Sequence, residues 1–174
     1  MRERLCRAMA SAGQSADYCE IRWEERTYTS LRFQGPVLES ITRGTNSGGM
    51  VRALKDGGWG VVTFNRPDDL PSFVDLAIRQ AALVGQAKKE PVVLAPVDPV
   101  EDVVPLAVRK DPRSIPLPEK KRLLEEYNRL ILSFGPPVVS SVVSYAESYT
   151  KKIFLNSEGT YIEQETVDMA GGFT

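Results

Sequence analysis

The sequence predicts an α+β fold in which one mostly antiparallel sheet, a five-strand meander plus three later strands, carries helices packed on one face. Apolar residues recur with a helical period in three segments and alternate with a period of two in several others. The alternating segments follow one another with only short turns between them. Because strands joined by short turns are antiparallel neighbours, this order differs from the strand–helix alternation of parallel sheets.

The chain is long enough for one domain with its own core, and its bulk composition is that of a globular protein. It has 174 residues, of which 42% are hydrophobic and 26% are charged, with a formal net charge of −1. No apolar run approaches the roughly 20 residues of a membrane helix, and the first residues are charged. We therefore expect a single cytoplasmic domain over residues 1–174, without membrane contact.

The first helix and the first five strands are predicted from the change of period along the chain. Leu5, Ala8, Met9 and Ala12 lie on one face of a helix that Gly13 ends, and residues 14–16 form a turn. Strands are expected at residues 18–24, 28–33, 37–43, 50–54 and 59–64. In the first strand every second residue is charged, which predicts that Glu20 faces solvent.

Glycines mark two of the connections in this meander. The segment 44–49 holds three glycines between two strands, and Asp56-Gly57-Gly58 has the composition of a tight turn. A phosphate-binding loop would be followed by a helix, so residues 44–49 are interpreted as a hairpin connection.

A second helix is predicted from about Asp69, with Pro71 in its first turn, to about Ala87. Its apolar face is formed by Phe73, Leu76, Ala77, Ala81 and Val84. Residues 91–118 hold seven of the twelve prolines but also many valines and leucines, which predicts an extended crossover on the surface without regular structure.

A third helix opens at Pro118-Glu119 and stops at Gly135-Pro136-Pro137. Its apolar stripe is formed by Leu123, Leu124, Tyr127, Leu130 and Ile131. Three strands follow at residues 138–148, 151–155 and 160–167, with a turn over residues 156–159.

Residue types limit the chemistry that this chain can perform. With no His, it has neither a Ser/His or Cys/His catalytic pair nor an imidazole metal site. Cys6 and Cys19 are interpreted as small reduced core residues, the alternative being a reactive thiol. The near-zero net charge gives no basis for nucleic-acid binding.

The remaining motifs are interpreted as surface or core. The adjacent carboxylates Glu24-Glu25, Asp68-Asp69 and Glu125-Glu126 diverge in direction, so we place them on the surface. Glu163 and Glu165 share one face of a strand. They could form a functional acidic edge, but we expect them to be solvent-exposed surface residues. The basic runs 120–122 and 151–152 are placed on the surface.

The larger aromatics are placed in the core rather than on a platform for single-stranded nucleic acid: Tyr18, Trp23, Tyr28, Trp59, Tyr145 and Phe154. No catalytic, metal-binding or cofactor-binding residue is assigned, and the substrate-binding residues are unknown.

Three stretches carry the motifs of a known family. Residues 16–22 read A-D-Y-C-E-I-R, and residues 48–60 read G-G-M-V-R-A-L-K-D-G-G-W-G. The third combines Asp111-Pro112 with E-K-K-R-L-L at residues 119–124 and N-S-E-G at residues 156–159. In this order they resemble the N-terminal region of the TldD/PmbA family, the "modulator of DNA gyrase" zinc metallopeptidases, with the second stretch closer to the TldD branch.

The resemblance implies a non-catalytic N-terminal domain of a cytoplasmic metallopeptidase that acts on unfolded or peptide substrates. The family holds its zinc with an HExxxH helix and a later cysteine, which have no counterpart here, so zinc is implied for the full-length protein and not for this chain. The domain would contribute substrate access and subunit assembly, with the C-terminal catalytic region or a partner subunit as its partner. The alternative is a stand-alone binding or modulator module without peptidase activity; an in-frame HExxxH after codon 174 would separate the two.

Overall fold

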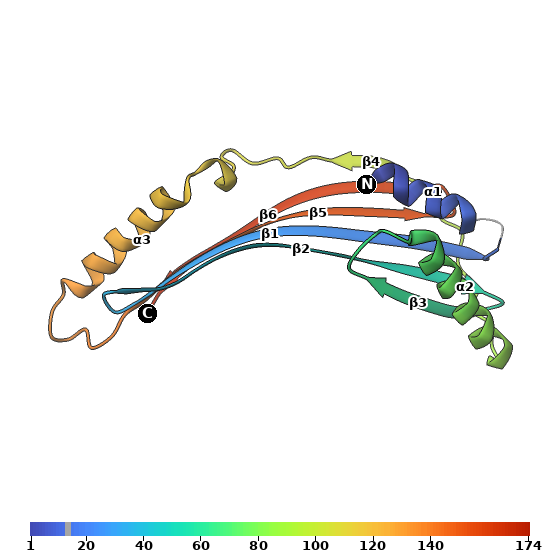
Figure 1. Ribbon diagram of the computed structural model, residues 1–174, viewed down its shortest axis with the longest axis horizontal. Coiled ribbons are helices and arrows are strands. Elements are labelled where there is room, and N and C mark those ends of the chain that lie inside the picture. Colours follow the sequence, from blue (N-terminus) through green and yellow to red (C-terminus); the bar gives the residue numbers. More distant parts are fainter. Residues whose placement is uncertain (13–14) are drawn as a thin grey trace. The chain divides into compact units, whose positions relative to one another are not determined.

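The structure is a computed structural model that describes residues 1–12 and 15–174. Its elements are α1 (Arg2–Ala12), β1 (Tyr18–Gln34), β2 (Val37–Lys55), β3 (Gly58–Phe64), α2 (Leu70–Ala87), β4 (Glu101–Val104), a short 3-10 helix η1 (Pro112–Ser114), α3 (Leu117–Leu132), β5 (Val142–Asn156) and β6 (Tyr161–Phe173) (Figure 1). The strands form one sheet in the order β3-β2-β1-β5-β6-β4. Strands β2 and β3 are antiparallel, whereas β4 pairs in parallel with β6. The predicted α+β class is confirmed.

The strands are fewer and longer than the sequence predicted. Strand β1 joins the segments expected at 18–24 and 28–33, β5 begins at Val142 and joins 138–148 to 151–155, and β6 continues to Phe173. The polar residues between the expected strands were interpreted as turns. Where both faces of a sheet are exposed to solvent, its residues do not alternate between apolar and polar. The sequence pattern that predicts a strand therefore ends there, although the hydrogen bonds between the strands continue.

The predicted loop at residues 44–49 is wrong, because these residues lie within β2. Their glycines allow close approach of other groups. A Cβ on Gly44 would lie 2.6 Å from the Tyr28 hydroxyl oxygen, and one on Gly49 would lie 2.7 Å from the carbonyl oxygen of Arg22. Glycine inside a strand is typical of such crowded positions.

The tight turns are where the sequence placed them. Asp56 and Gly57 have φ of 49° and 75°, as a two-residue hairpin turn between β2 and β3 requires. Gly159 has φ of 97°, and the Asn156 side chain accepts hydrogen bonds from the backbone N–H groups of Glu158 and Thr160. The predicted helix end at Gly13 and the first residue of the predicted turn at 14–16 lie outside the described residues.

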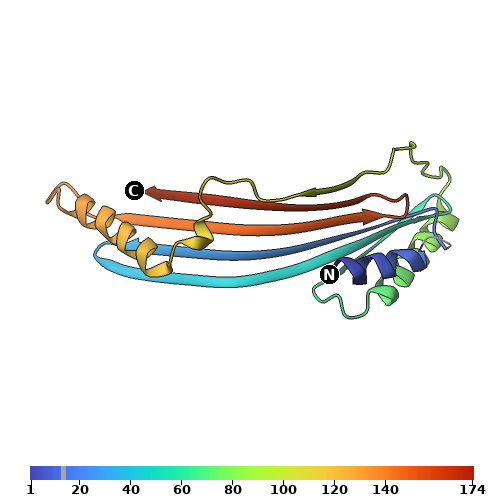
Figure 2. The same cartoon turned by 90° about the horizontal axis from the view of Figure 1, so that it is seen from above.

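The chain divides into two compact units. Unit 1 comprises Met1–Glu25, Ser47–Pro105 and Lys151–Glu165, and unit 2 comprises Arg26–Asn46, Leu106–Thr150 and Thr166–Thr174. In unit 1, α2 packs on β3 and α1 lies beside α2 (Figures 1 and 2). The core of unit 1 includes all four residues predicted for the inner face of α1, namely Leu5, Ala8, Met9 and Ala12.

Helix α2 has the predicted bounds, and its predicted apolar face is confirmed for Ala77 and Ala81, which are buried, and for Phe73, which packs against the core. Its buried residues are Leu70, Val74, Ala77 and Ala81. Leu76 and Val84, which were expected to be buried, are exposed. A Cβ on Gly60 would lie 2.0 Å from the carbonyl oxygen of Ala77, so strand and helix backbones approach each other closely. Small side chains, Ala77 and Ala81, therefore face the sheet where the two backbones approach each other.

Two further predictions for unit 1 are wrong. Glu20 is only 1% exposed, because Tyr18, Arg22 and Arg52 all donate hydrogen bonds to its carboxylate. Cys19 is buried as expected, but Cys6 is exposed on α1. Both thiols are free.

The crossover 91–118 is more ordered than expected. It contains β4, which pairs with β6 from Glu101 opposite Tyr161 to Val104 opposite Gln164. It also contains η1, whose N-cap Asp111 accepts a hydrogen bond from the backbone N–H of Arg113 at 2.9 Å. Between these elements the segment has no regular structure, as predicted.

Unit 2 contains α3, whose predicted apolar stripe is confirmed for Leu124 and Ile131 and is wrong for Leu123, Tyr127 and Leu130, which are exposed. Its buried residues are Lys120, Leu124 and Asn128. The Asn128 amide donates to the carbonyl oxygen of Gly35 at 2.7 Å and accepts from the Ser141 hydroxyl at 3.0 Å, which explains how a polar side chain is buried there. Gly135 ends the helical region with φ of 76°, as predicted. The core of unit 2 includes Leu31, Phe33, Leu124 and Val143.

The helices of the part of the chain that is described are too short or too polar to cross a membrane.

Candidate functional site

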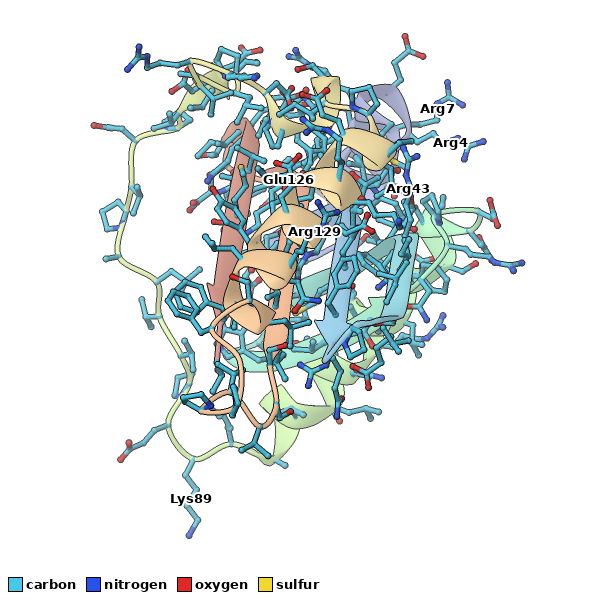
Figure 3. The ribbon with its side chains drawn as sticks, turned by 90° about the vertical axis from the view of Figure 1, so that its left-hand side faces the viewer. Arg4, Arg7, Arg43, Lys89, Glu126 and Arg129 are labelled. Atoms are coloured by element: carbon cyan, nitrogen blue, oxygen red, sulfur yellow. The ribbon has the colours of Figure 1, made fainter. Side chains whose placement is uncertain are left out.

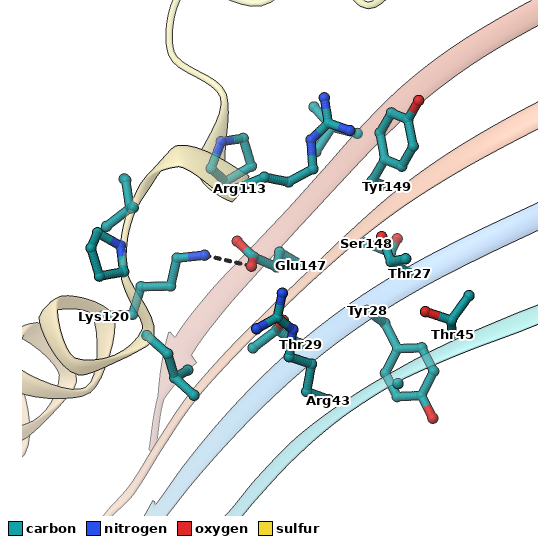
Figure 4. A pocket seen from close by; sticks show the side chains of 16 residues that line it. Thr27, Tyr28, Thr29, Arg43, Thr45, Arg113, Lys120, Glu147, Ser148 and Tyr149 are labelled. Atoms are coloured by element: carbon teal, nitrogen blue, oxygen red, sulfur yellow. Dashed lines mark hydrogen bonds and ion pairs between the residues drawn. The ribbon is translucent and has the colours of Figure 1, made fainter.

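A pocket of about 320 Å³ lies in unit 2 over polar side chains of three strands (Figure 4). Each of these strands contributes three consecutive residues to the lining, 27–29 from β1, 43–45 from β2 and 147–149 from β5. The first and third residues of each set form a pair: Thr27 and Thr29, Arg43 and Thr45, and Glu147 and Tyr149. Since side chains alternate along a strand, each pair points to one face of the sheet. The other wall is formed by residues 112–117 and Lys120, from η1 to the first turn of α3.

A buried ion pair stands at the centre of this pocket. The Lys120 ammonium nitrogen lies 2.5 Å from Oε1 of Glu147, and the two side chains are only 8% and 9% exposed. The Tyr145 hydroxyl donates to Oε2 of Glu147 at 2.5 Å. Burial and this hydrogen bond raise the pKa of Tyr145 well above its ordinary value. The prediction that Lys120 lies on the surface is wrong, because its counter-ion is 27 residues away in the sequence.

Arg113 lines the pocket and is held in place by two partners. Its guanidinium donates to Asp111 from Nε at 2.9 Å and stacks 3.8 Å from the centre of the Tyr149 ring. The hydrogen bonds from Arg113 lower the pKa of the Asp111 carboxyl, and the Asp111 side chain raises the pKa of Arg113. The charge of this arginine is therefore already neutralised within the chain.

Two other groups in the pocket have no such partners. The Arg43 side chain makes no hydrogen bond or ion pair with any residue that the structure describes, and its guanidinium points toward Thr29 and Glu147 in Figure 4. Thr29 is 9% exposed, and its hydroxyl has no partner within residues 1–12 and 15–174. Both are hydrogen-bond donors, so the pocket is suited to an oxygen-rich, negatively charged group.

The residues of this chain do not fit a catalytic metal. The described part of the chain contains no group of three or more Cys, Asp and Glu residues that could hold an ion, and the sequence has no His. The pocket carboxylate, Glu147, is bound to Lys120 and Tyr145.

The other sequence-predicted candidates are not brought together into a site. Glu24, Glu25, Asp68 and Asp69 are exposed, as expected. Glu163 differs from the prediction, because it is ion-paired with Lys151 and accepts a hydrogen bond from Tyr161 at 2.9 Å. The Lys151 hydrogen bond is the main reason that its pKa is lowered.

The predicted core role of the aromatics is confirmed for Tyr18 and Trp23, which are buried. Trp23 stacks on Phe64 with ring centres 5.9 Å apart. The other four are half-buried, namely Tyr28, Trp59, Tyr145 and Phe154.

Sequence reasoning missed Arg43, Lys120 and Glu147 as members of one pocket. The only sequence signal was the spacing of polar residues by two, as in Thr27 and Thr29, which indicates a polar sheet face. That spacing gives no information on which distant segment covers the face.

The pocket adjoins an unpaired strand edge. In the sheet order, the neighbours of β2 are β1 and β3, and β3 pairs only with residues 49–55 of β2. Residues 37–48 of β2, which include Arg43 and Thr45, therefore have no strand on their outer side within the described chain. Strand β6 has a similar edge at residues 165–173, because β4 pairs only with residues 161–164.

Two models of one family match the chain. The PmbA/TldA metallopeptidase domain 1 matches residues 19–81, and the PmbA/TldA metallopeptidase central domain matches residues 110–173. A metalloprotease from Synechocystis is 36% identical over 151 residues, which are 86% of this chain and 32% of that protein. The chain spans about a third of the length of the curated relatives it matches.

Solved structures share the fold. A Bacteroides thetaiotaomicron protein described as a modulator of DNA gyrase has a TM-score of 0.81 at 16% identity, over 99% of this chain and 40% of its own. TldE from Thermococcus kodakarensis has a TM-score of 0.68 at 15% identity, over 98% of this chain and 42% of its own. At 15–16% identity these structures show only that the fold is shared. The relationship in sequence is shown by the matches to the two family models. The chain therefore belongs to the TldD/PmbA family, and the parts of the family that it matches are domain 1 and the central domain.

Proposed function

We propose that this chain is a non-catalytic, peptide-binding N-terminal domain of a TldD/PmbA metallopeptidase. The unpaired edge of β2 at residues 37–48 is the main support for this proposal. Such an edge presents backbone N–H and C=O groups that an extended peptide can pair with. Backbone pairing tolerates many side chains, which suits a protein that receives unfolded or peptide substrates.

The zinc implied for the family would be held by residues outside this chain. The absence of His from the sequence supports this division of roles. The domain then delivers a bound peptide to the catalytic region and does not cleave it.

A second surface is suited to assembly with the catalytic region or with a partner subunit. Leu123, Tyr127, Leu130 and Phe134 are between 45% and 70% exposed, at spacings of three and four residues along α3 and just beyond its end. They form one apolar stripe. By the helical period, Glu126 and Arg129, which are labelled on α3 in Figure 3, lie on one side of this stripe. Charged residues beside an apolar patch are typical of protein interfaces.

Peptide binding can be tested by fluorescence anisotropy with a labelled ten-residue peptide of alternating Thr and Val. The matched control is the same peptide N-methylated at every second residue, which cannot form a strand ladder on that side. We expect the unmodified peptide to bind, the control to lose binding, and neither to be cleaved in the presence of zinc. Equal binding of the two peptides would contradict edge pairing, and zinc-dependent cleavage by the pure chain would contradict the non-catalytic role.

The assembly role needs a separate measurement. We expect the chain to form a complex with the separately produced C-terminal region of a TldD/PmbA protein in sedimentation experiments, and Leu130→Lys to weaken it. A chain that stays monomeric in that mixture would favour the alternative, a stand-alone binding module.

A further inference from the structure

We propose that the pocket beside β2 binds a carboxylate of the peptide that pairs with this strand. This inference rests on the proposed peptide-binding role of the β2 edge and assigns it a preference for acidic peptides. The first support is position, because Arg43 and Thr45 belong both to the pocket lining and to the unpaired part of β2.

The geometry of strand addition brings a ligand side chain to these residues. Directly opposite residues of two paired strands have Cβ atoms about 4.5–5.5 Å apart, and every second residue faces the same side. One side chain of an added strand would therefore lie next to Arg43 on the pocket side of the sheet.

The charges of the pocket favour a negatively charged side chain at this position of the added strand. Lys120 is paired with Glu147, and Arg113 is paired with Asp111. This leaves Arg43 as the pocket cation whose charge is not balanced by a carboxylate of the described chain. Because Glu147 is engaged by Lys120 and Tyr145, it does not compete with a ligand carboxylate for the guanidinium.

The Thr29 hydroxyl and the Arg43 guanidinium together favour a carboxylate over an apolar or cationic group. Thr29 lines the pocket, and its hydroxyl makes no hydrogen bond to another described residue, so it can donate one to a ligand oxygen. A guanidinium binds the two oxygens of a carboxylate in parallel. Ile115 and Leu117 provide an apolar wall for the methylene groups of an acidic side chain.

The test compares peptides that differ in one charge. Three amidated ten-residue Thr/Val peptides carry Glu, Gln or Lys at the centre, and a fourth carries central Gln with a free C-terminal carboxylate. We expect the Glu peptide to bind roughly tenfold more tightly than the Gln peptide, and the Lys peptide to bind most weakly. Tight binding of the fourth peptide alone would assign the pocket to a chain terminus, which retains the carboxylate chemistry.

Protein variants separate the pocket from the strand edge. Arg43→Gln should remove the difference between the Glu and Gln peptides without weakening the Gln peptide, and Arg43→Lys should restore part of it. Thr29→Val, which keeps the side-chain shape, should reduce the preference without abolishing binding. The matched control is Arg129→Gln, which changes the same charge on α3 outside the pocket lining and should leave all affinities unchanged.

The outcomes distinguish the two proposals. Equal affinities for the Glu, Gln and Lys peptides, with binding still lost on N-methylation, would overturn the carboxylate pocket and leave the β2 edge intact. An equal effect of Arg43→Gln and Arg129→Gln would also overturn the pocket, because it would show only long-range attraction. Failure of every peptide to bind would overturn both.

Discussion

Lys120 and Glu147 form an ion pair in unit 2 in which both side chains are withdrawn from solvent, at 8% and 9% exposure. Burying a single charge without a counter-ion costs several kcal/mol, whereas a complete pair is tolerated. The ion pair fixes the first turn of α3 over the sheet at the place where the pocket forms. The Lys120–Glu147 ion pair therefore positions the wall of the pocket.

Replacement of one partner should be strongly destabilising. We expect Glu147→Gln to lower the free energy of unfolding by about 3–5 kcal/mol, because Lys120 is left buried without a counter-charge. The matched control is Glu125→Gln, which breaks the exposed Lys121–Glu125 pair on the same helix and should cost less than about 0.5 kcal/mol. Urea unfolding followed by circular dichroism would measure both, and equal losses would contradict the role assigned to the buried pair.

Buried tyrosines make a second residue-scale prediction, which concerns alkaline pH. Burial, followed by the hydrogen bond to Glu20, raises the pKa of Tyr18 to about 12. The unfolded chain ionises its tyrosines near pH 10, so this stabilising effect is complete below pH 10 and is lost as the pH rises from about 10 through 12.

We therefore expect melting temperatures to fall steeply above pH 10 and Tyr18→Phe to reduce that fall. Tyr127→Phe, at an exposed position on α3, serves as the control and should leave the pH dependence unchanged. If Tyr18→Phe and the parent protein lost stability equally between pH 9 and 11.5, Tyr18 would have no part in the effect.

At the scale of elements, the contact between β3 and α2 depends on glycine. A Cβ on Gly58 would lie 2.2 Å from the backbone nitrogen of Gly85, and one on Gly60 would lie 2.0 Å from the Ala77 carbonyl oxygen. These neighbours are helix backbone, which cannot turn aside as a side chain can. The D-G-G-W-G motif thus combines a turn at Gly57 with two glycines, Gly58 and Gly60, that let α2 pack closely on β3.

A methyl group at Gly60 should push α2 away from the sheet. We expect Gly60→Ala to lower the free energy of unfolding by about 1–3 kcal/mol, which is typical of overpacking. Gly172→Ala is the matched control, because a Cβ there has no neighbour within 4 Å, and it should change stability by less than about 0.5 kcal/mol. Chemical denaturation of both variants provides the comparison, and a Gly60→Ala protein as stable as the control would show that the helix backbone yields freely.

Helices and turns of this fold were predictable because their signals are local. The helical period, the positive φ at Asp56 and Gly57, and the Asn156 turn each depend on a few neighbouring residues. Strand lengths were not predictable, because the exposed middle of β1 and β2 has no apolar alternation. The helical period gave part of the inner faces of α2 and α3, namely Ala77, Ala81 and Leu124. The burial of Lys120 and the pocket depend on a distant partner, Glu147, which no local pattern reveals.

At the scale of the whole molecule, the number of cooperative units is the open physical question. Each compact unit has its own buried cluster, one built around α1 and α2 and the other around α3. Yet β1, β2, β5 and β6 each contribute residues to both units without an interruption of the strand. Because a continuous strand transmits the loss of its backbone ladder along its length, we predict that residues 1–174 unfold as the single domain expected from the sequence.

The positions of the tryptophans make this prediction testable. Both Trp23 and Trp59 belong to unit 1, so tryptophan fluorescence reports on unit 1, whereas far-UV circular dichroism reports on the strands and helices of both units. Leu124→Ala removes a buried side chain from unit 2 and should cost about 2–5 kcal/mol. In a single cooperative transition this variant shifts the fluorescence midpoint in urea as far as the circular dichroism midpoint. The exposed Leu123→Ala on the same helix should shift neither. A Leu124→Ala protein whose fluorescence transition stays at the parent midpoint, while its circular dichroism curve splits in two, would show that the units unfold independently and that the chain holds two domains.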